Sequence, residues 1–161
     1  MIRFLVFLSA LTMMTACFSS GSSSNPQLTF SNDDGLELTL PSGFVDATDK
    51  VSSLGYPVGD SKHYTENLDI SSENQTINYT GKLIEIDTDD DALGNGHDYS
   101  ICGSTTSQLV YSEDDEEGDE AYRANVSLND VNYQIIFKAF GGAQMWTEAE
   151  VKAVLDTCPG S

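Results

Sequence analysis

The sequence predicts an α+β fold, an antiparallel sheet of about six to eight strands with a C-terminal amphipathic helix packed on it. Between residues 28 and 140, several short segments alternate apolar and polar side chains, which is the pattern of half-buried strands. The last segment instead repeats its apolar residues every three or four positions, which is typical of a helix. Because the strands precede the helix, segregated elements are expected. The alternative is an all-β sandwich with an appended helix.

The first expected hairpin joins residues 28–30 to residues 36–40. An Asp-Gly dipeptide, which is common in tight turns, lies between them. The second strand has one apolar face, because three leucines alternate with polar residues: Leu36, Leu38 and Leu40. A Pro-Ser-Gly sequence then ends this strand.

The middle of the chain gives weaker signals. Residues 44–74 are expected to be mostly loop, with one short helix or strand, because glycine and proline interrupt any periodicity. Four short strands are expected to follow, over residues 76–79, 82–86, 99–102 and 108–112. A Thr-Gly pair separates the first two of them.

The clearest strand pair covers residues 122–128 and 131–140, with an Asn-Asp turn between them. The first strand alternates apolar and polar residues throughout. The second strand is apolar on part of its other face as well, through Ile136 and Phe140. Such a strand is expected in the centre of a sheet, with a layer packed on each side.

The expected helix begins after Thr147. Glu150 lies three residues further on, and this spacing is that of a capping box. Helical spacing then brings four apolar residues onto one face: Val151, Val154, Leu155 and Cys158. A Pro-Gly pair stops the helix, and its apolar stripe is expected to face the sheet.

Both ends of this domain carry a family resemblance. An apolar strand that closes in Pro-Ser-Gly-Phe covers residues 38–44, and a late strand that leads into the terminal helix covers residues 131–139. These segments resemble the two ends of the PsbP-like and DcrB-like envelope lipoproteins, a family of α/β/α sandwiches. The resemblance implies an accessory or binding role rather than chemistry, and it brings no shared catalytic residues.

The N-terminus resembles the signal of a bacterial lipoprotein. A short positive start and an apolar core, too short to span a bilayer, lead to the small residues that precede Cys17. The resemblance implies that residues 1–16 are a signal peptide and that Cys17 becomes the diacylglyceryl-modified first residue. The residue after it is Phe rather than Asp, which by the same resemblance favours the outer membrane. Residues 17–25 are expected to form a flexible Ser/Gly tether, and residues 26–161 a single globular domain.

Two cysteines remain in that domain, Cys102 and Cys158. Because the chain is expected to be exported, its compartment permits disulfides, and two thiols allow a single pairing. A Cys102–Cys158 disulfide is therefore predicted. The alternative is two separate buried thiols.

Charge excludes one class of partner and suggests another. The chain has 26 acidic and 7 basic residues, a formal net charge of -19. Nucleic acid is therefore excluded, because phosphate recognition needs clustered Lys and Arg. The spacing of Asp87, Asp89, Asp91 and Asp98 resembles a calcium-binding loop of the EF-hand type, with Asn95 as a further oxygen ligand. Ala92 stands where that loop requires Gly, and a solvated acidic loop is the alternative.

No nucleophile motif, phosphate-binding loop or histidine-containing metal motif appears in the sequence. We therefore predict a non-enzymatic envelope lipoprotein that binds or scaffolds another envelope protein or a ligand. The membrane is its partner through the lipid on Cys17. The alternative is a calcium-dependent binding module that uses the Asp-rich loop at residues 87–98. No other cofactor is expected.

Overall fold

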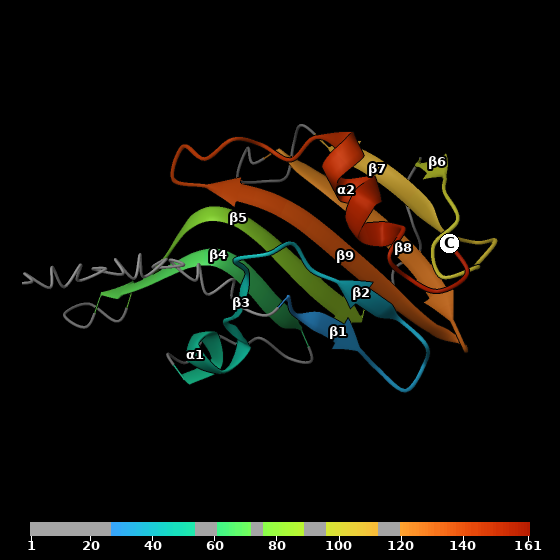
Figure 1. Ribbon diagram of the computed structural model, residues 1–161, viewed down its shortest axis with the longest axis horizontal. Coiled ribbons are helices and arrows are strands. Elements are labelled where there is room, and N and C mark those ends of the chain that lie inside the picture. The colour runs from blue at the N-terminus through green and yellow to red at the C-terminus, as the bar shows by residue number, and fades with distance from the viewer. Residues whose placement is uncertain (1–26, 54–60, 72–75, 89–95, 113–119) are drawn as a thin grey trace, which may run out of the picture.

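A computed structural model describes residues 27–53, 61–71, 76–88, 96–112 and 120–161 (Figure 1). The signal peptide, Cys17 and the tether lie outside these residues and stay predictions. Within the described residues, no helix is long and apolar enough to cross a membrane.

The described chain folds into an open antiparallel sheet of seven strands in the order β3-β4-β5-β9-β8-β7-β6. Its strands are β3 (Val45–Asp46), β4 (Lys62–Ser71), β5 (Thr76–Thr88), β6 (His97–Asp98), β7 (Gln108–Ser112), β8 (Ala121–Leu128) and β9 (Val131–Phe140). A separate hairpin pairs β1 (Thr29–Ser31) with β2 (Glu37–Thr39), and the helices are α1 (Thr48–Ser53) and α2 (Glu148–Leu155). The predicted α+β class, with a C-terminal helix, is confirmed.

One face of the sheet is covered by two elements from opposite ends of the chain. Figure 1 shows α2 and the β1–β2 hairpin side by side over this face. Together they form the main core with β5, β8 and β9. The hairpin supplies three fully buried leucines and the helix supplies its apolar stripe: Leu36, Leu38, Leu40, Val151, Val154 and Leu155. This burial is the dominant favourable term that holds the helix on the sheet.

The central position of the last long strand is confirmed, since β9 is the fourth of the seven strands. Its side chains alternate between the two faces. Phe137 and Ile135 are fully buried under the hairpin and helix. On the opposite face, Leu83 and Ala121 are buried as well, so the sheet is not simply solvated there. Ile136 and Phe140, on that face of β9 itself, are only partly buried, so a layer packed on each side of this strand is not confirmed.

Three predictions for the middle of the chain were wrong in detail. Residues 62–71 form the long strand β4, where mostly loop was expected. Its Tyr64 and Thr65 are consecutive and both buried, so this strand lacks the polar-apolar alternation that reveals a half-buried strand. Residues 99–102 form no strand, and only Ile101 makes an isolated bridge, to Ser104.

The two strands expected at 76–79 and 82–86 are one continuous strand, β5. Gly81 does not turn the chain but sits opposite a register shift in β4, between Thr65 and Asn67. It has a φ of 104°, and a Cβ there would lie 2.8 Å from the carboxylate of Glu66. Glycine is therefore required here because of its backbone conformation and its close contact with β4. Glycine is also common in turns, so in the sequence this residue suggests a break between two strands.

The predicted capping box is confirmed at the start of α2. The Thr147 hydroxyl accepts a hydrogen bond from the backbone N–H of Glu150. The carboxylate of Glu150 accepts one from the backbone N–H of Thr147 at 2.8 Å. Glu150 also forms an ion pair with Lys82 at 2.6 Å, and Lys82 Nζ lies 4.6 Å from the ring centroid of Trp146.

We expect the Glu150→Gln variant to lose part of the pH dependence of stability. Hydrogen bonds from Lys82 and the Thr147 backbone lower the pKa of Glu150 from 4.5 to about 2. The stabilisation by its charge is therefore complete above pH 4.5 and is lost as the pH falls towards 2. Because the Glu150 side chain is 46% exposed, the variant should lose less than about 1 kcal/mol of unfolding free energy at pH 7.

Urea unfolding at pH 7 and pH 3 measures this effect. The matched control is Glu148→Gln, which removes a more exposed ion pair on the same helix but no capping bond. Identical pH dependence in the wild type and the Glu150→Gln variant would refute the assignment.

Candidate functional site

A pocket of about 380 Å³ opens between α2 and the edge of the sheet formed by β6, β7 and β8. Three tyrosines line it: Tyr99, Tyr111 and Tyr122. Its charged lining residues are Asp98 from β6 and Glu148 and Lys152 from α2. We call this cavity the tyrosine pocket. Its volume and its mixture of aromatic and polar groups are those of a small-molecule or side-chain binding site.

The sheet side of the tyrosine pocket is set by strand register. Tyr111 on β7 lies opposite Tyr122 on β8, and both side chains point to the face that carries α2. Their ring centroids are 4.7 Å apart, with an angle of 44° between the rings. Tyr111 is 44% exposed and is one of two large hydrophobic residues exposed among the described residues. An aromatic side chain so exposed beside a cavity offers a contact surface to a ligand.

Tyr99 comes from a loop that its own hydrogen bonds hold in shape. The Ser107 hydroxyl donates to the backbone carbonyl of Tyr99 and accepts from the backbone N–H of Ile101. The Tyr99 hydroxyl donates to the carboxylate of Asp156. Burial and Asp156 together raise the pKa of Tyr99 to about 12, so the phenol stays protonated at physiological pH.

Charges on α2 form the rim of the tyrosine pocket. Lys152 and Glu148 form an i,i+4 ion pair at 2.5 Å. Lys152 Nζ also lies 5.2 Å from the centroid of the Tyr99 ring, a cation–π distance. The hydrogen bond and charge of Lys152 lower the pKa of Glu148, and the charge of His97 adds to this shift. The rim thus joins α2 to the loop that carries Tyr99, through the contact of Lys152 with the Tyr99 ring.

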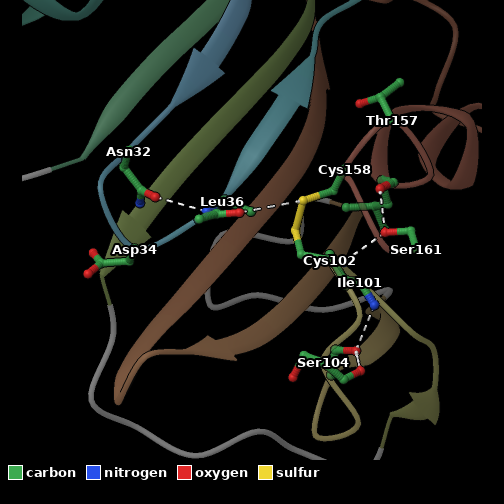
Figure 2. The surroundings of a disulfide bond; sticks show 12 residues. Asn32, Asp34, Leu36, Ile101, Cys102, Ser104, Thr157, Cys158 and Ser161 are labelled. Atoms are coloured by element: carbon green, nitrogen blue, oxygen red, sulfur yellow. Dashed lines mark hydrogen bonds between the residues drawn. A yellow bond between two sulfur atoms is a disulfide. The ribbon is translucent and has the colours of Figure 1, made fainter.

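The predicted disulfide between Cys102 and Cys158 is present, with the two Cα atoms 4.9 Å apart. Figure 2 shows that it ties the loop after β6 to the chain just beyond α2, beside the turn that precedes Leu36. Cys158 is only 2% exposed. The bond holds together the Tyr99 loop and the helix, which form two walls of the tyrosine pocket.

The hydrogen bonds drawn in Figure 2 reinforce this junction. The backbone N–H of Cys102 donates to the Ser161 hydroxyl at 2.7 Å, and this hydroxyl donates to the carbonyl of Leu155 at 3.3 Å. Two glycines with positive φ meet here, Gly103 and Gly160, and a Cβ on Gly103 would lie 3.4 Å from the Gly160 carbonyl oxygen. Their small size lets the two segments approach closely.

The predicted calcium ligands are not brought together as one set. Asp87 lies on β5 and Asp98 on β6, and three strands separate β5 from β6 in the sheet. At the usual strand spacing that is about 19 Å, so these two carboxylates cannot share one ion. The reason is that residues 87 and 98 lie on strands that are not neighbours in the sheet. Asp89, Asp91 and Asn95 lie outside the described residues, so a calcium site built on Asp87 with these three stays a prediction.

Among the described residues, no group of three or more His, Cys, Asp or Glu side chains is placed to hold a metal ion. The chain matches no protein-family model, no curated protein and no solved structure. The resemblances of its N-terminus and of its domain ends to envelope lipoproteins therefore stay predictions. The geometry of the tyrosine pocket is therefore the basis for a functional proposal.

No pattern in the sequence marks the three pocket tyrosines as functional residues. The sequence pattern places Tyr122 on an apolar strand face, and Tyr99 and Tyr111 lie in two short expected strands. Their convergence depends on the pairing of β7 with β8 and on the position of α2, which no local pattern encodes. The one available signal was that these strands carry tyrosine, whose hydroxyl suits a half-exposed position.

Proposed function

We propose that this chain is a lipid-anchored accessory protein of the bacterial envelope that binds a ligand or partner in the tyrosine pocket. The observation that supports binding is the pocket itself, a cavity of about 380 Å³ with three tyrosines and a charged rim. Its walls come from α2, two paired strands and a loop fixed by a disulfide. A site on such fixed elements needs little reorganisation to bind.

Attachment to the membrane follows from the N-terminal sequence. The motif before Cys17 supports lipidation there, and the Ser/Gly-rich residues 18–25 give a flexible connection to the described domain, which starts at Gln27. Two or more acyl chains on one terminus give stable anchoring, whereas a single chain gives marginal binding. Lipid rather than protein charge would hold this acidic domain at the envelope.

We expect a Cys17→Ser variant to lose membrane attachment. Wild-type protein should fractionate with membranes and dissolve in detergent, whereas the variant should be recovered in the soluble fraction or stay unprocessed. Mass spectrometry of the wild type should find an acylated cysteine as the first residue. Ser19→Ala, in the same segment, is the matched control and should behave as wild type. An unlipidated N-terminus beyond residue 17 would contradict the anchor.

Site-specific photocrosslinking in intact envelopes tests the binding role. A photoreactive residue replaces Tyr111 in one variant and Val45 in another. Val45 is the second exposed large hydrophobic of the described residues, and it lies on β3, at the opposite edge of the sheet. A defined adduct is expected at position 111 and not at position 45. Adducts at both positions alike, or at neither, would count against the tyrosine pocket as the binding site.

A further inference from the structure

We propose that the tyrosine pocket binds an organic cation, a quaternary ammonium or guanidinium group, against the exposed ring of Tyr111, which packs on Tyr122. This inference rests on the proposed binding function and names the chemical class of the ligand. It extends to the Tyr111 ring a contact that the chain already makes in the same pocket, between Lys152 and the ring of Tyr99.

The first argument is that the protein places a cation on an aromatic ring of this pocket. Lys152 Nζ lies 5.2 Å from the Tyr99 centroid. The negative face of an aromatic ring attracts a cation at such a distance, and more strongly when water is partly excluded. Tyr111 and Tyr122 carry the same kind of ring, and Tyr111 presents 44% of its surface to solvent.

The second argument is the charge balance of the pocket lining. Glu148 already forms an ion pair with Lys152. Asp98 also lines the pocket and is exposed, but the register of β6 with β7 places its side chain with that of Gln108, on the opposite face of the sheet from Tyr111. The lining thus carries two carboxylates and one lysine, a net negative charge that favours a cation over an anion. The formal net charge of -19 acts in the same direction, since it raises the local concentration of cations and speeds their association.

The third argument concerns size and shape. The cavity of about 380 Å³ lies within the range that holds small ligands, so a trimethylammonium or guanidinium group fits without opening the fold. The Tyr111 and Tyr122 rings pack on each other, with centroids 4.7 Å apart and an angle of 44°, so Tyr122 supports the partly exposed ring of Tyr111 from behind. A rounded or planar cation can lie on that exposed part of the Tyr111 ring. A neutral apolar ligand of the same shape would gain the contact area without the electrostatic attraction.

Calorimetry on the full-length chain in detergent tests the inference with three probes. Choline carries a quaternary ammonium, argininamide carries a guanidinium, and 3,3-dimethylbutan-1-ol is a neutral analogue of choline with the same shape. At least one cation is expected to bind about tenfold more tightly than the neutral alcohol. The two cationic probes then tell which of the two groups the pocket prefers. Equal binding of choline and the alcohol would overturn the cation assignment.

Variants locate the binding. Tyr111→Phe keeps the ring and should retain most of the affinity, whereas Tyr111→Ala should lose about tenfold. Asp98→Asn should weaken the cationic probes alone. Val45→Ala is the control and should change nothing, and thermal unfolding of each variant checks that it is folded. Binding that survives Tyr111→Ala would refute the proposed position of the ligand.

Failure of this inference differs from failure of the proposed function. If a specific adduct forms at position 111 but no cationic probe binds, the pocket is a binding site and the ligand class is wrong. If position 111 forms no specific adduct and probe binding survives Tyr111→Ala, both proposals fail together.

Discussion

Replacing both Cys102 and Cys158 with alanine is expected to lower the free energy of unfolding by about 4 kcal/mol. The disulfide joins residues 56 positions apart, so it removes much of the conformational freedom of the unfolded chain. Alanine is the suitable replacement because Cys158 is almost fully buried, and a serine there would add a buried hydroxyl to the effect. A loss of this size is a large part of the stability of a small domain.

Urea unfolding of the full-length chain measures the difference between the oxidised wild type and the double variant. Cys17→Ala is the matched control, since it removes a cysteine without touching the disulfide, and it should unfold like the wild type. Hydrogen exchange should show the largest loss of protection in α2 and in the loop that carries Tyr99. A change below 1 kcal/mol would mean that packing alone holds these segments together.

Parts of the fold with strong local signals were predictable from the sequence. The capping box of Thr147 and Glu150 fixed the start of α2, because both partners lie within one turn of the helix. The hairpin of β8 and β9 was predictable because its two strands are adjacent in sequence and its turn is short. The disulfide was predictable because two cysteines permit one pairing.

Features that depend on distant pairing were not predictable. Nothing local shows that β5 pairs with β9, some fifty residues later in the chain, or that this places β5 far from β6. The calcium set joining Asp87 to Asp98 failed for this reason. The tyrosine pocket was missed for the same reason, because Tyr99, Tyr111 and Glu148 meet only after the sheet and the helix are both in place.

Replacing Phe137 with alanine should cost about 3–5 kcal/mol, an effect as large as the loss of the disulfide. Phe137 is fully buried on the central strand β9, and its ring meets that of Trp146 edge to face at 5.2 Å. Truncation removes this aromatic contact and leaves a cavity under α2. Urea unfolding followed by the fluorescence of Trp146, the single tryptophan, measures the change.

Exposed Val45→Ala is the control and should stay within about 0.5 kcal/mol of wild type.

The Phe137→Ala variant also tests how the core supports the tyrosine pocket. Phe137 does not line the pocket, but it lies directly opposite Tyr122 in the pairing of β8 with β9. A cavity beside Tyr122 frees its ring to move, so choline should bind more weakly to the folded variant. Unchanged choline affinity would show that the Tyr111–Tyr122 pair keeps its geometry without support from the core.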